Sequence, residues 1–326
     1  MMRAPSLLPA KVLRVAVVYN PAKVDVVRLR LLLEEAEAAA GYEPAFWFET
    51  APGDDGEQAA VDAAATHPVF VLVAGGDGTV RTVAEQLAGS AVPLAVAAAG
   101  SGNLLARALG LPVSDLPAAV KSAFDGAAHA IDVGHATLQH ADGMVASHVF
   151  LVMAGIGLDA RMAAGTNPRL KKRLGWVAYA EPIGRSVLAN ADFALHYRLD
   201  GGRRHSTRAH TVIVGNCGTL TGGILLIPDA RPDDGILDTV ILRPRRKGAW
   251  LQIGVRLALS RFLHRTTTGK FLRQLVRQPF ALRYARARRI DVTFNTPQEV
   301  ELDGDSFGAI TAANITIRPG ALQLIS

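Results

Sequence analysis

The first third of the chain alternates short apolar runs with stretches of helical periodicity. Residues 12–19, 69–73 and 93–97 have the β-branched and apolar content of strands, whereas residues 24–40 carry apolar side chains at helical spacing. Each strand-like run is followed by a turn and, in most cases, a helix-like stretch. This alternation is typical of a doubly wound, mostly parallel α/β sheet.

The pattern changes after residue 131. Strand-like runs follow at residues 145–153, 209–214, 237–242, 290–294 and 315–317. Two helical insertions, at residues 169–188 and 247–277, interrupt them. We therefore expect an α/β domain over residues 1–130 and a β-rich domain over residues 131–326, whose C-terminal tail could return to the first domain.

Composition narrows the class of protein. The chain has 326 residues, of which 49% are hydrophobic, and a single cysteine, Cys217, so an intrachain disulfide is excluded. No apolar run reaches the roughly 18 residues needed to span a bilayer, and the N-terminus lacks the apolar core of a secretory signal. We expect a cytoplasmic protein. Its formal net charge of +6 indicates an anionic partner, which could be a phosphate-bearing substrate, an anionic lipid or nucleic acid.

One glycine-rich turn, Gly75-Gly76-Asp77-Gly78-Thr79, lies between a strand-like run and a helix-like stretch at residues 80–87. Glycines let a phosphate approach the backbone closely, and the start of a helix supplies unpaired N–H groups and a favourable dipole. The turn has neither the Walker sequence nor the dinucleotide-binding G-x-G-x-x-G spacing. It is either a phosphate-binding turn or a tight structural turn whose aspartate caps a helix.

Two further turns have the same placement. Gly100-Ser101-Gly102-Asn103 follows a strand-like run and opens a helix-like stretch at residues 104–109, with Ser101 or Asn103 as its cap. Because the carboxyl ends of parallel strands meet at one edge of a sheet, we expect the two glycine turns to converge on one crevice. After the first strand, Asn20 could bond a ribose or a phosphate, and Lys23 could add positive charge.

Read in order, these segments resemble the diacylglycerol kinase catalytic-domain family of soluble bacterial lipid kinases, which includes the sphingosine and ceramide kinases. The resemblance covers about residues 12–304. Its other motifs are Ala154-Gly155-Ile156-Gly157-Leu158-Asp159-Ala160, the basic helix at residues 172–179, Gly222-Gly223 with Pro228 and Ala230, the run at residues 233–238, and Leu302-Asp303-Gly304-Asp305.

The resemblance implies an N-terminal nucleotide domain, a C-terminal β-sandwich domain and an active site between them. It places nucleotide binding at Asn20, Thr50, Gly76, Asp77, Gly78, Thr79 and Ser101; the turns themselves add Lys23, Gly75, Gly100, Gly102 and Asn103. The chain departs from the family in two places. Ala22-Lys23-Val24 replaces a small residue and glycine, and Asp305 replaces a glutamate, which shortens that carboxylate by one methylene.

Phosphoryl transfer requires positioning, neutralisation of charge and a group that accepts a proton. Asp77 is suited to hold Mg²⁺ on the phosphates of ATP, since hard cations prefer carboxylate oxygen. Asp303 or Asp305 would orient and deprotonate a lipid hydroxyl, and the resemblance favours Asp305. Asp303-Gly304 is also a strong β-hairpin signal.

A second Mg²⁺ site, structural rather than catalytic, is implied by the resemblance. Its ligands would be the backbone oxygens of Arg231 and Ile236 and the carboxylate of Asp234. The alternative is that Asp233-Asp234-Gly235 forms a plain loop, because these residues favour turns.

Residues 243–289 hold 14 Lys or Arg residues and no Asp or Glu, interleaved with large apolar side chains. Such a segment fits docking on an anionic membrane surface; the alternative is an amphipathic helix with a solvated basic face. No zinc-ligand spacing or RNA-binding motif accompanies the charge, so we do not expect nucleic acid as a partner. We expect peripheral membrane association, and a homodimer is left open.

Together these features predict an ATP-dependent lipid kinase that uses Mg²⁺ and phosphorylates a lipid hydroxyl. Diacylglycerol, giving phosphatidic acid, is the first choice of substrate. One alternative is a soluble-substrate kinase with the same glycine turn, such as an NAD kinase. The other is a catalytically silent lipid- or nucleotide-binding regulator.

Overall fold

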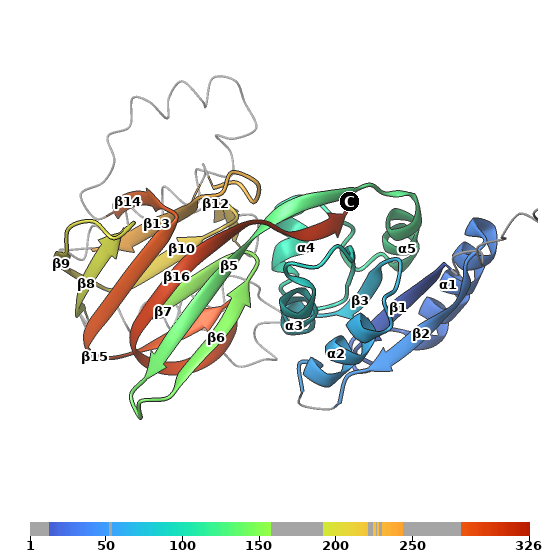
Figure 1. The fold of residues 1–326 in the computed structure, drawn as a ribbon, viewed down its shortest axis with the longest axis horizontal. Coiled ribbons are helices and arrows are strands. Elements are labelled where there is room, and N and C mark those ends of the chain that lie inside the picture. The colour runs from blue at the N-terminus through green and yellow to red at the C-terminus, as the bar shows by residue number, and fades with distance from the viewer. Residues whose placement is uncertain are drawn as a thin grey trace, which may run out of the picture.

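The structure, a computed structural model, describes residues 13–51, 54–157, 192–220, 224–225, 227, 230–243 and 282–326. Within these residues, fourteen strands form one continuous mixed sheet, and β11 (Thr219–Leu220) pairs with β12 (Ile224–Leu225) in a separate ribbon. The two halves of the large sheet differ in architecture and lie side by side in Figure 1.

The N-terminal half is a parallel sheet in the order β4-β3-β1-β2, with helices between the strands. Its strands are β1 (Arg14–Tyr19), β2 (Glu43–Glu49), β3 (Val71–Gly75) and β4 (Leu94–Ala98). Its helices are α1 (Val26–Ala40), α2 (Glu57–Ala65), α3 (Asp77–Leu87), α4 (Leu104–Leu109) and α5 (Leu116–Asp125).

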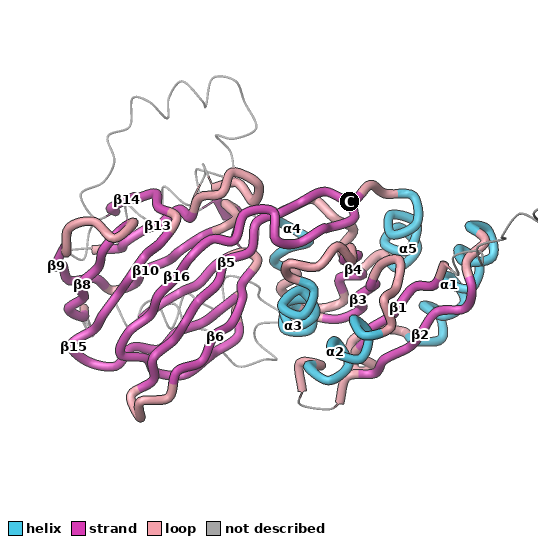
Figure 2. The backbone as a smooth tube through the Cα atoms, in the orientation of Figure 1, coloured by secondary structure: helices cyan, strands magenta, loops and turns pink. Residues whose placement is uncertain are grey.

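Side chains of this sheet alternate between two cores. Ala16 and Val18 of β1 pack in the core that includes residues of α2 and α3, whereas Val15 and Val17 pack in the core that includes residues of α1 and α5. Figure 2 shows the helices on both sides of these strands. The prediction of a doubly wound α/β domain is confirmed.

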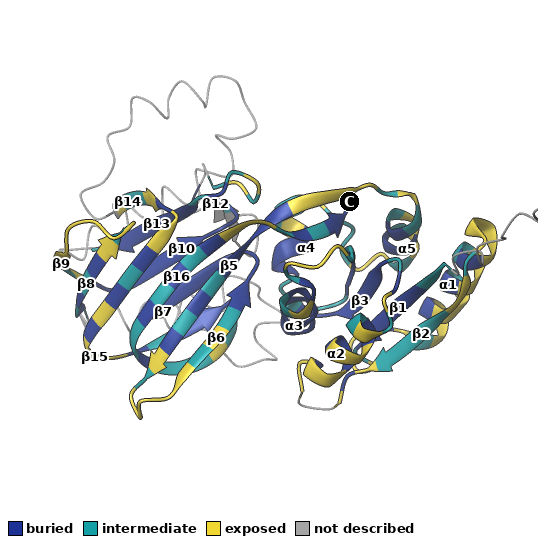
Figure 3. Cartoon of the chain, in the orientation of Figure 1, coloured by how far each residue is buried: buried dark blue, intermediate teal, exposed yellow. Residues whose placement is uncertain are grey.

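The C-terminal half is antiparallel. Its strands are β5 (Ala128–His140), β6 (Val145–Phe150), β7 (Met153–Gly157), β8 (Phe193–Leu199), β9 (His205–Ala209), β10 (Thr211–Gly215), β13 (Leu237–Leu242), β14 (Leu282–Ala287), β15 (Arg289–Leu302) and β16 (Asp305–Ile325). Their inward side chains, including Phe150, Ile156 and Leu195, form a core of their own. Buried and exposed residues alternate along these strands (Figure 3), as expected of the predicted β-sandwich.

The structure differs from the predicted elements in places. Residues 145–153 were expected to form one strand, but β6 ends at Phe150 and β7 begins at Met153. The backbone N–H groups of Leu151 and Val152, which lie between them, bind the carboxylate of Asp303 and so leave the strand ladder. Several further elements had no predicted counterpart: strands β2, β5, β8, β9, β11, β12 and β14 and helices α2 and α5.

Two strands pass from one half of the molecule into the other. β5 and β16 pair antiparallel along most of their length, and near its end β16 pairs parallel with β4 through Leu324 and Leu94. The predicted boundary at residue 130 falls inside β5. The register of the β5–β16 pair shifts between Arg318 and Leu322, where Gly320 has a φ of +59°. This irregularity is a bulge in the two-stranded connection.

None of the helices in the described ranges has the length and apolar character needed to cross a bilayer. The two predicted helical insertions, at residues 169–188 and 247–277, lie outside the described residues.

Gly134 is predicted to be intolerant of a side chain. It pairs directly with Phe150 across β5 and β6, and a Cβ atom on it would lie 2.2 Å from the Cζ atom of that fully buried ring. Gly134→Ala should therefore lower the free energy of unfolding by about 1–3 kcal/mol, measured by urea denaturation. Combined with Phe150→Leu, it should cost less than the sum of the two single substitutions. Equal stability of Gly134→Ala and wild type would contradict this packing.

Candidate active site

Two glycine turns meet at the carboxyl edge of the parallel sheet. The first leaves β3 at Gly75 and places Gly76 at the N-cap of α3; the second leaves β4 and passes through Gly100 before α4. A Cβ atom on Gly100 would lie 2.7 Å from the Cα atom of Gly76, so the two backbones touch in a way that only glycine permits. The predicted convergence of the two turns is confirmed.

A positive charge lies against the first turn. A Cβ atom on Gly76 would lie 2.6 Å from the Nζ atom of Lys23, so the ammonium group is beside the turn backbone. The first N–H groups of α3 have no partner within that helix, and its dipole favours an anion at this end. Lys23 and the start of α3 therefore act on the same place, and both attract a phosphate.

Asp77 is the first residue of α3, but its carboxylate caps a different helix. Oδ2 accepts the N–H of Asn103 at 2.8 Å, and Oδ1 accepts the N–H of Leu104 at 2.5 Å. These amides begin α4, so Asp77 joins the two glycine turns. The structure thus supports the helix-cap interpretation, although for α4 rather than α3. The role of Asp77 as an Mg²⁺ ligand stays a prediction.

Asn103 closes the second turn on itself. Its Oδ1 accepts the N–H of Gly100, and its Nδ2 donates to the carbonyl oxygen of Gly100, both at 2.8 Å. Its φ of +51° is in the left-handed region, which asparagine tolerates better than most residues. Asn103 therefore shapes the turn. Gly102 lies against the Asp77 carboxylate, and Ser101 is exposed.

Asn20 and Thr50 follow the ends of the neighbouring strands β1 and β2. The side chain of Asn20 accepts the N–H of Ala22 at 3.0 Å, which shapes the turn that carries Lys23. Thr50 is buried, and its hydroxyl has no hydrogen-bond partner among the described residues. An unpaired buried hydroxyl is unfavourable, and nothing among the described residues explains this one. The side chain of Thr79 packs against Gly75 instead.

Asp303 is 4% exposed and is held by backbone amides. Its carboxylate accepts the N–H groups of Leu151, Val152 and Met153 at 2.7, 2.8 and 3.0 Å. Burial raises the pKa of Asp303 to about 6, although the three amides lower it. Asp303 and Gly304 both have positive φ, as a tight hairpin turn between β15 and β16 requires. The hairpin interpretation is confirmed.

Asp305, two residues further along, faces the first glycine turn. A Cβ atom on Gly78 would lie 2.9 Å from Oδ2 of Asp305 and 2.6 Å from Oδ1 of Asp55, so two carboxylates flank Gly78. Burial raises the pKa of Asp305; the charge of Asp55 raises it further, and that of Arg81 lowers it. The hairpin of the C-terminal half thus brings a carboxylate against the turn of the N-terminal half.

Two residues of this arrangement, Asp55 and Arg81, were not predicted from the sequence. Arg81 lies one helical turn after Asp77, and its guanidinium reaches Asp55 at 3.5 Å and Asp305 at 3.7 Å. The feature of the sequence that could have identified Arg81 is a single cation among the apolar residues of α3. Asp55 gave no separate signal, because the preceding Asp54 is a turn former and indeed accepts the N–H of Gly56.

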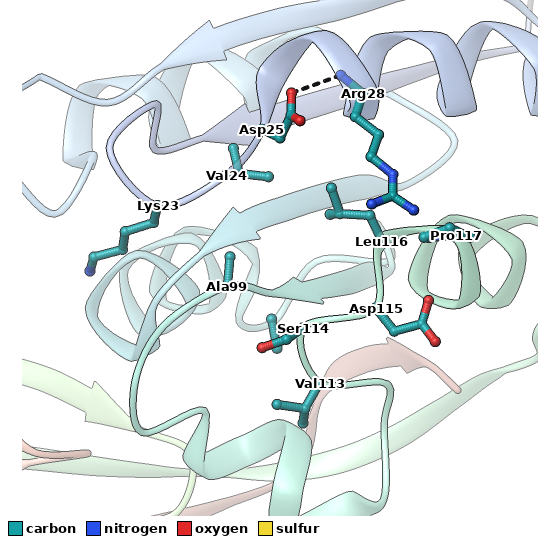
Figure 4. A pocket seen from close by; sticks show the side chains of 11 residues that line it. Lys23, Val24, Asp25, Arg28, Ala99, Val113, Ser114, Asp115, Leu116 and Pro117 are labelled. Carbon is teal, nitrogen blue, oxygen red and sulfur yellow. Dashed lines mark hydrogen bonds between the residues drawn. The ribbon is translucent and has the colours of Figure 1, made fainter. Parts of the chain in front are cut away.

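A hollow of about 500 Å³ opens beside the turns. Lys23 and Arg28 border it on the α1 side, and residues 113–117 border it on the α5 side (Figure 4). Its two acidic residues, Asp25 and Asp115, each accept an N–H group at the start of a helix. The hollow has the volume of a small-molecule site, and its basic side chains favour an anionic ligand.

The described residues contain no cluster of three His, Cys, Asp or Glu side chains that could hold a metal ion unaided. An Mg²⁺ ion bound to a nucleotide takes most of its ligands from phosphates and water and needs one or two carboxylates. Asp55 lies at Gly78 and Asp77 at Gly102, and these are the carboxylates that the two turns offer for this purpose.

The predicted structural metal site has a different occupant. Oδ1 of Asp234 accepts the N–H of Ile236 at 3.1 Å, and Oδ2 accepts a guanidinium N–H of Arg286 at 2.6 Å. Arg286 also lies 3.3 Å from Asp238. Arg231 directs its side chain to the neighbouring Asp233. The carboxylate predicted to bind Mg²⁺ is thus already paired with a cation, which opposes the binding of a divalent ion there. The metal site itself stays a prediction.

We therefore expect the melting temperature of the wild-type protein to be the same in EDTA and in Mg²⁺. Arg286→Met should make the melting temperature rise with Mg²⁺, because it frees Asp234 for an ion that binds only the folded state. The matched control is Arg289→Met, which removes a similar guanidinium–carboxylate pair with Asp291 on the next strand. A wild-type melting temperature that falls on addition of EDTA would contradict this assignment.

Several motif residues lie outside the described residues: Leu158, Asp159 and Ala160, the helix at residues 172–179, Gly222, Gly223 and Pro228, and most of the basic segment at residues 243–289.

The chain matches two protein-family models in succession. Residues 14–136 match the diacylglycerol kinase catalytic domain, and residues 152–326 match the YegS C-terminal NAD kinase beta sandwich-like domain. The chain is 34% identical to a probable lipid kinase YegS-like protein from Pseudomonas fluorescens, over 89% of its own length and 88% of the relative. It is 27% identical to a diacylglycerol kinase from Bacillus subtilis, with 91% of each chain covered.

Solved structures support the same fold. A diacylglycerol kinase structure from Bacillus anthracis aligns with a TM-score of 0.63 at 21% identity, covering 96% of each chain. Yeast NADH kinase aligns with a TM-score of 0.50 at 11% identity, covering 97% of this chain and 83% of its own. The family models and the relatives that match nearly the full length agree with the two-part architecture and the paired glycine turns: the chain belongs to the diacylglycerol kinase catalytic-domain family and is an ATP-dependent lipid kinase.

Proposed function

We propose that the protein transfers the γ-phosphate of ATP to the hydroxyl group of diacylglycerol and so produces phosphatidic acid. The observation that carries this proposal is the position of Asp305. Its carboxylate lies against Gly78 of the first glycine turn, which is where a general base must lie to act on a hydroxyl beside a bound phosphate.

The nucleotide is held chiefly by backbone. The triphosphate lies over the two touching glycine turns, where the start of α3 and the ammonium of Lys23 offset its charge. The hollow beside Lys23 gives room for the rest of the nucleotide. Asp55 and Asp77 would hold Mg²⁺, which supplies charge neutralisation on the phosphates when bound.

Asp305 acts on the acceptor. Its carboxylate takes the proton of the lipid hydroxyl as the hydroxyl oxygen bonds to the γ-phosphorus and the bond from that phosphorus to the bridging oxygen breaks, leaving ADP. The raised pKa of Asp305 makes it a stronger base than an ordinary aspartate. Asp303 is buried and its carboxylate accepts three backbone N–H groups, so we assign it the role of fixing the hairpin.

The positive charge of residues 243–289 bears on where in the cell the protein works. We propose that the protein works in the cytoplasm, peripherally on an anionic membrane surface, because residues 243–289 carry 14 basic residues and no acidic ones. The overlap of fold with yeast NADH kinase keeps a soluble substrate such as NAD as the second candidate.

The proposal is tested by measuring transfer from γ-labelled ATP to diacylglycerol in mixed micelles containing an anionic lipid. Asp305→Asn should lower kcat by about 10²–10⁴-fold, the usual contribution of a general base, in a protein that remains folded without urea. Asp200→Asn is the control, since it makes the same change of charge at an exposed aspartate of the β8–β9 connection.

Other lipids with a free hydroxyl and NAD serve as competing acceptors. Faster transfer to NAD than to any lipid would reject the proposed substrate class. Faster transfer to another lipid would keep the mechanism and replace diacylglycerol.

Asp303→Asn should lower the free energy of unfolding, and not only the rate of phosphoryl transfer. Asparagine offers one acceptor oxygen where Asp303 offers two, so at least one of the three amides is left unpaired, at about 1–3 kcal/mol. Urea denaturation measures this loss. If Asp303→Asn abolished phosphorylation with an unchanged urea midpoint, Asp303 would be the base and our assignment would be reversed.

A further inference from the structure

The side chain of Arg81 lies where three parts of the chain meet, and it is only 6% exposed. Arg81 belongs to α3, which contacts β6 and β16 of the C-terminal half (Figure 1). Its Nη2 is 3.5 Å from Asp55 and its Nε is 3.7 Å from Asp305. Its Nη1 is 3.6 Å from Glu85, one turn along the same helix. One buried cation therefore faces three carboxylates from three elements.

An aromatic ring fixes the guanidinium from the other side. The Cζ atom of Arg81 lies 4.8 Å from the ring centre of Phe307, a distance suited to a cation–π contact. Phe307 packs in turn against the imidazole of His148, with ring centres 4.5 Å apart. Asp305 and Phe307 are two residues apart in β16 and so share one face of the strand. Arg81 thus touches that face at two points.

The contact with Asp305 joins two atoms that have no other hydrogen-bond partner. Nε of Arg81 and Oδ2 of Asp305 are both buried and both lack a hydrogen bond among the described residues. At 3.7 Å they form an ion pair but not a hydrogen bond; an approach of roughly 0.5 Å would make one. The same Oδ2 atom is the one that faces Gly78.

A positive charge is needed at this place. The carboxylates of Asp55 and Asp305 both flank Gly78, so they repel each other and would repel a triphosphate on the glycine turns. Arg81 is the cation that pairs with both of them. Lys23 lies at Gly76 instead.

We propose that Arg81 is a positioning residue, which holds the carboxylate of Asp305 beside the first glycine turn and thereby joins the two halves of the active site. This inference rests on the proposed role of Asp305. Arg81 acts through Asp305 rather than by contact with ATP. Its effect on the reaction therefore depends on the presence of that carboxylate.

A double-mutant cycle on the full-length protein tests the proposal. Arg81→Met should lower kcat for lipid phosphorylation by about 100-fold, the order expected when a reacting group is misplaced by about 1 Å, with KM for ATP nearly unchanged. In an Asp305→Asn background the same substitution should lower kcat by no more than about twofold, since residues that act as one unit are not additive. Arg81→Lys keeps the charge but not the planar guanidinium group. Its kcat should lie between those of the wild type and Arg81→Met.

Arg14→Met is the matched control. Arg14 also combines a carboxylate partner, Glu43 at 3.8 Å, with an aromatic ring, Phe46 at 4.6 Å, but it lies at the start of β1. The kcat of Arg14→Met should equal that of the wild type. Additive losses in the Arg81–Asp305 cycle, or a rise in KM for ATP with unchanged kcat, would overturn the proposal.

Urea unfolding is measured for the four proteins of the cycle, which are the wild type, Arg81→Met, Asp305→Asn and the double variant. If the wild type phosphorylated no acceptor, the proposed function would fail, but the unfolding cycle would still test the contact. Coupled shifts of the urea midpoint support the pairing of Arg81 with Asp305. Additive shifts overturn it whatever the activity.

Discussion

The carboxylate of Asp303 is the contact on which the arrangement of the site depends. It accepts three consecutive backbone N–H groups, from residues that lie about 150 positions earlier in the chain. This contact separates β6 from β7, fixes the β15–β16 hairpin and determines where Asp305 lies. Because one buried acid performs all three tasks, Asp303 places the backbone that carries Asp305. The contact with Arg81, as we propose, then orients the Asp305 carboxylate.

The glycine turns depend on each other in a similar way. Gly100 and Gly76 touch through their backbones, while Asp77 of one turn caps the helix that follows the other. Each turn therefore helps to fix the shape of the other. The surface that we propose for phosphate binding is a property of the pair.

Local patterns predicted the features that local physics controls. Apolar runs gave β1, β3 and β4, glycine and asparagine marked the turns, and Asp303-Gly304 marked a hairpin. The change of pattern after residue 131 predicted the two-part architecture, and the family resemblance predicted the β-sandwich and an active site between the two parts. What the sequence could not predict were contacts between residues far apart in the chain. Asp77 caps a helix 27 residues away, Asp303 binds amides in another strand connection, and Arg81 meets carboxylates from two other elements.

The connection between the two halves has a mechanical consequence. β5 and β16 run across it as a hydrogen-bonded ribbon, whose register shifts at the bulge between Arg318 and Leu322. Asp132 pins that bulge by accepting the N–H of Gly320 on one oxygen and of Gly235 on the other. A ribbon of this kind bends less readily than a single-stranded linker. Any change in the separation of Asp305 from the glycine turns must therefore strain the ribbon at its bulge. The two halves are thus elastically coupled, unlike domains joined by a flexible linker.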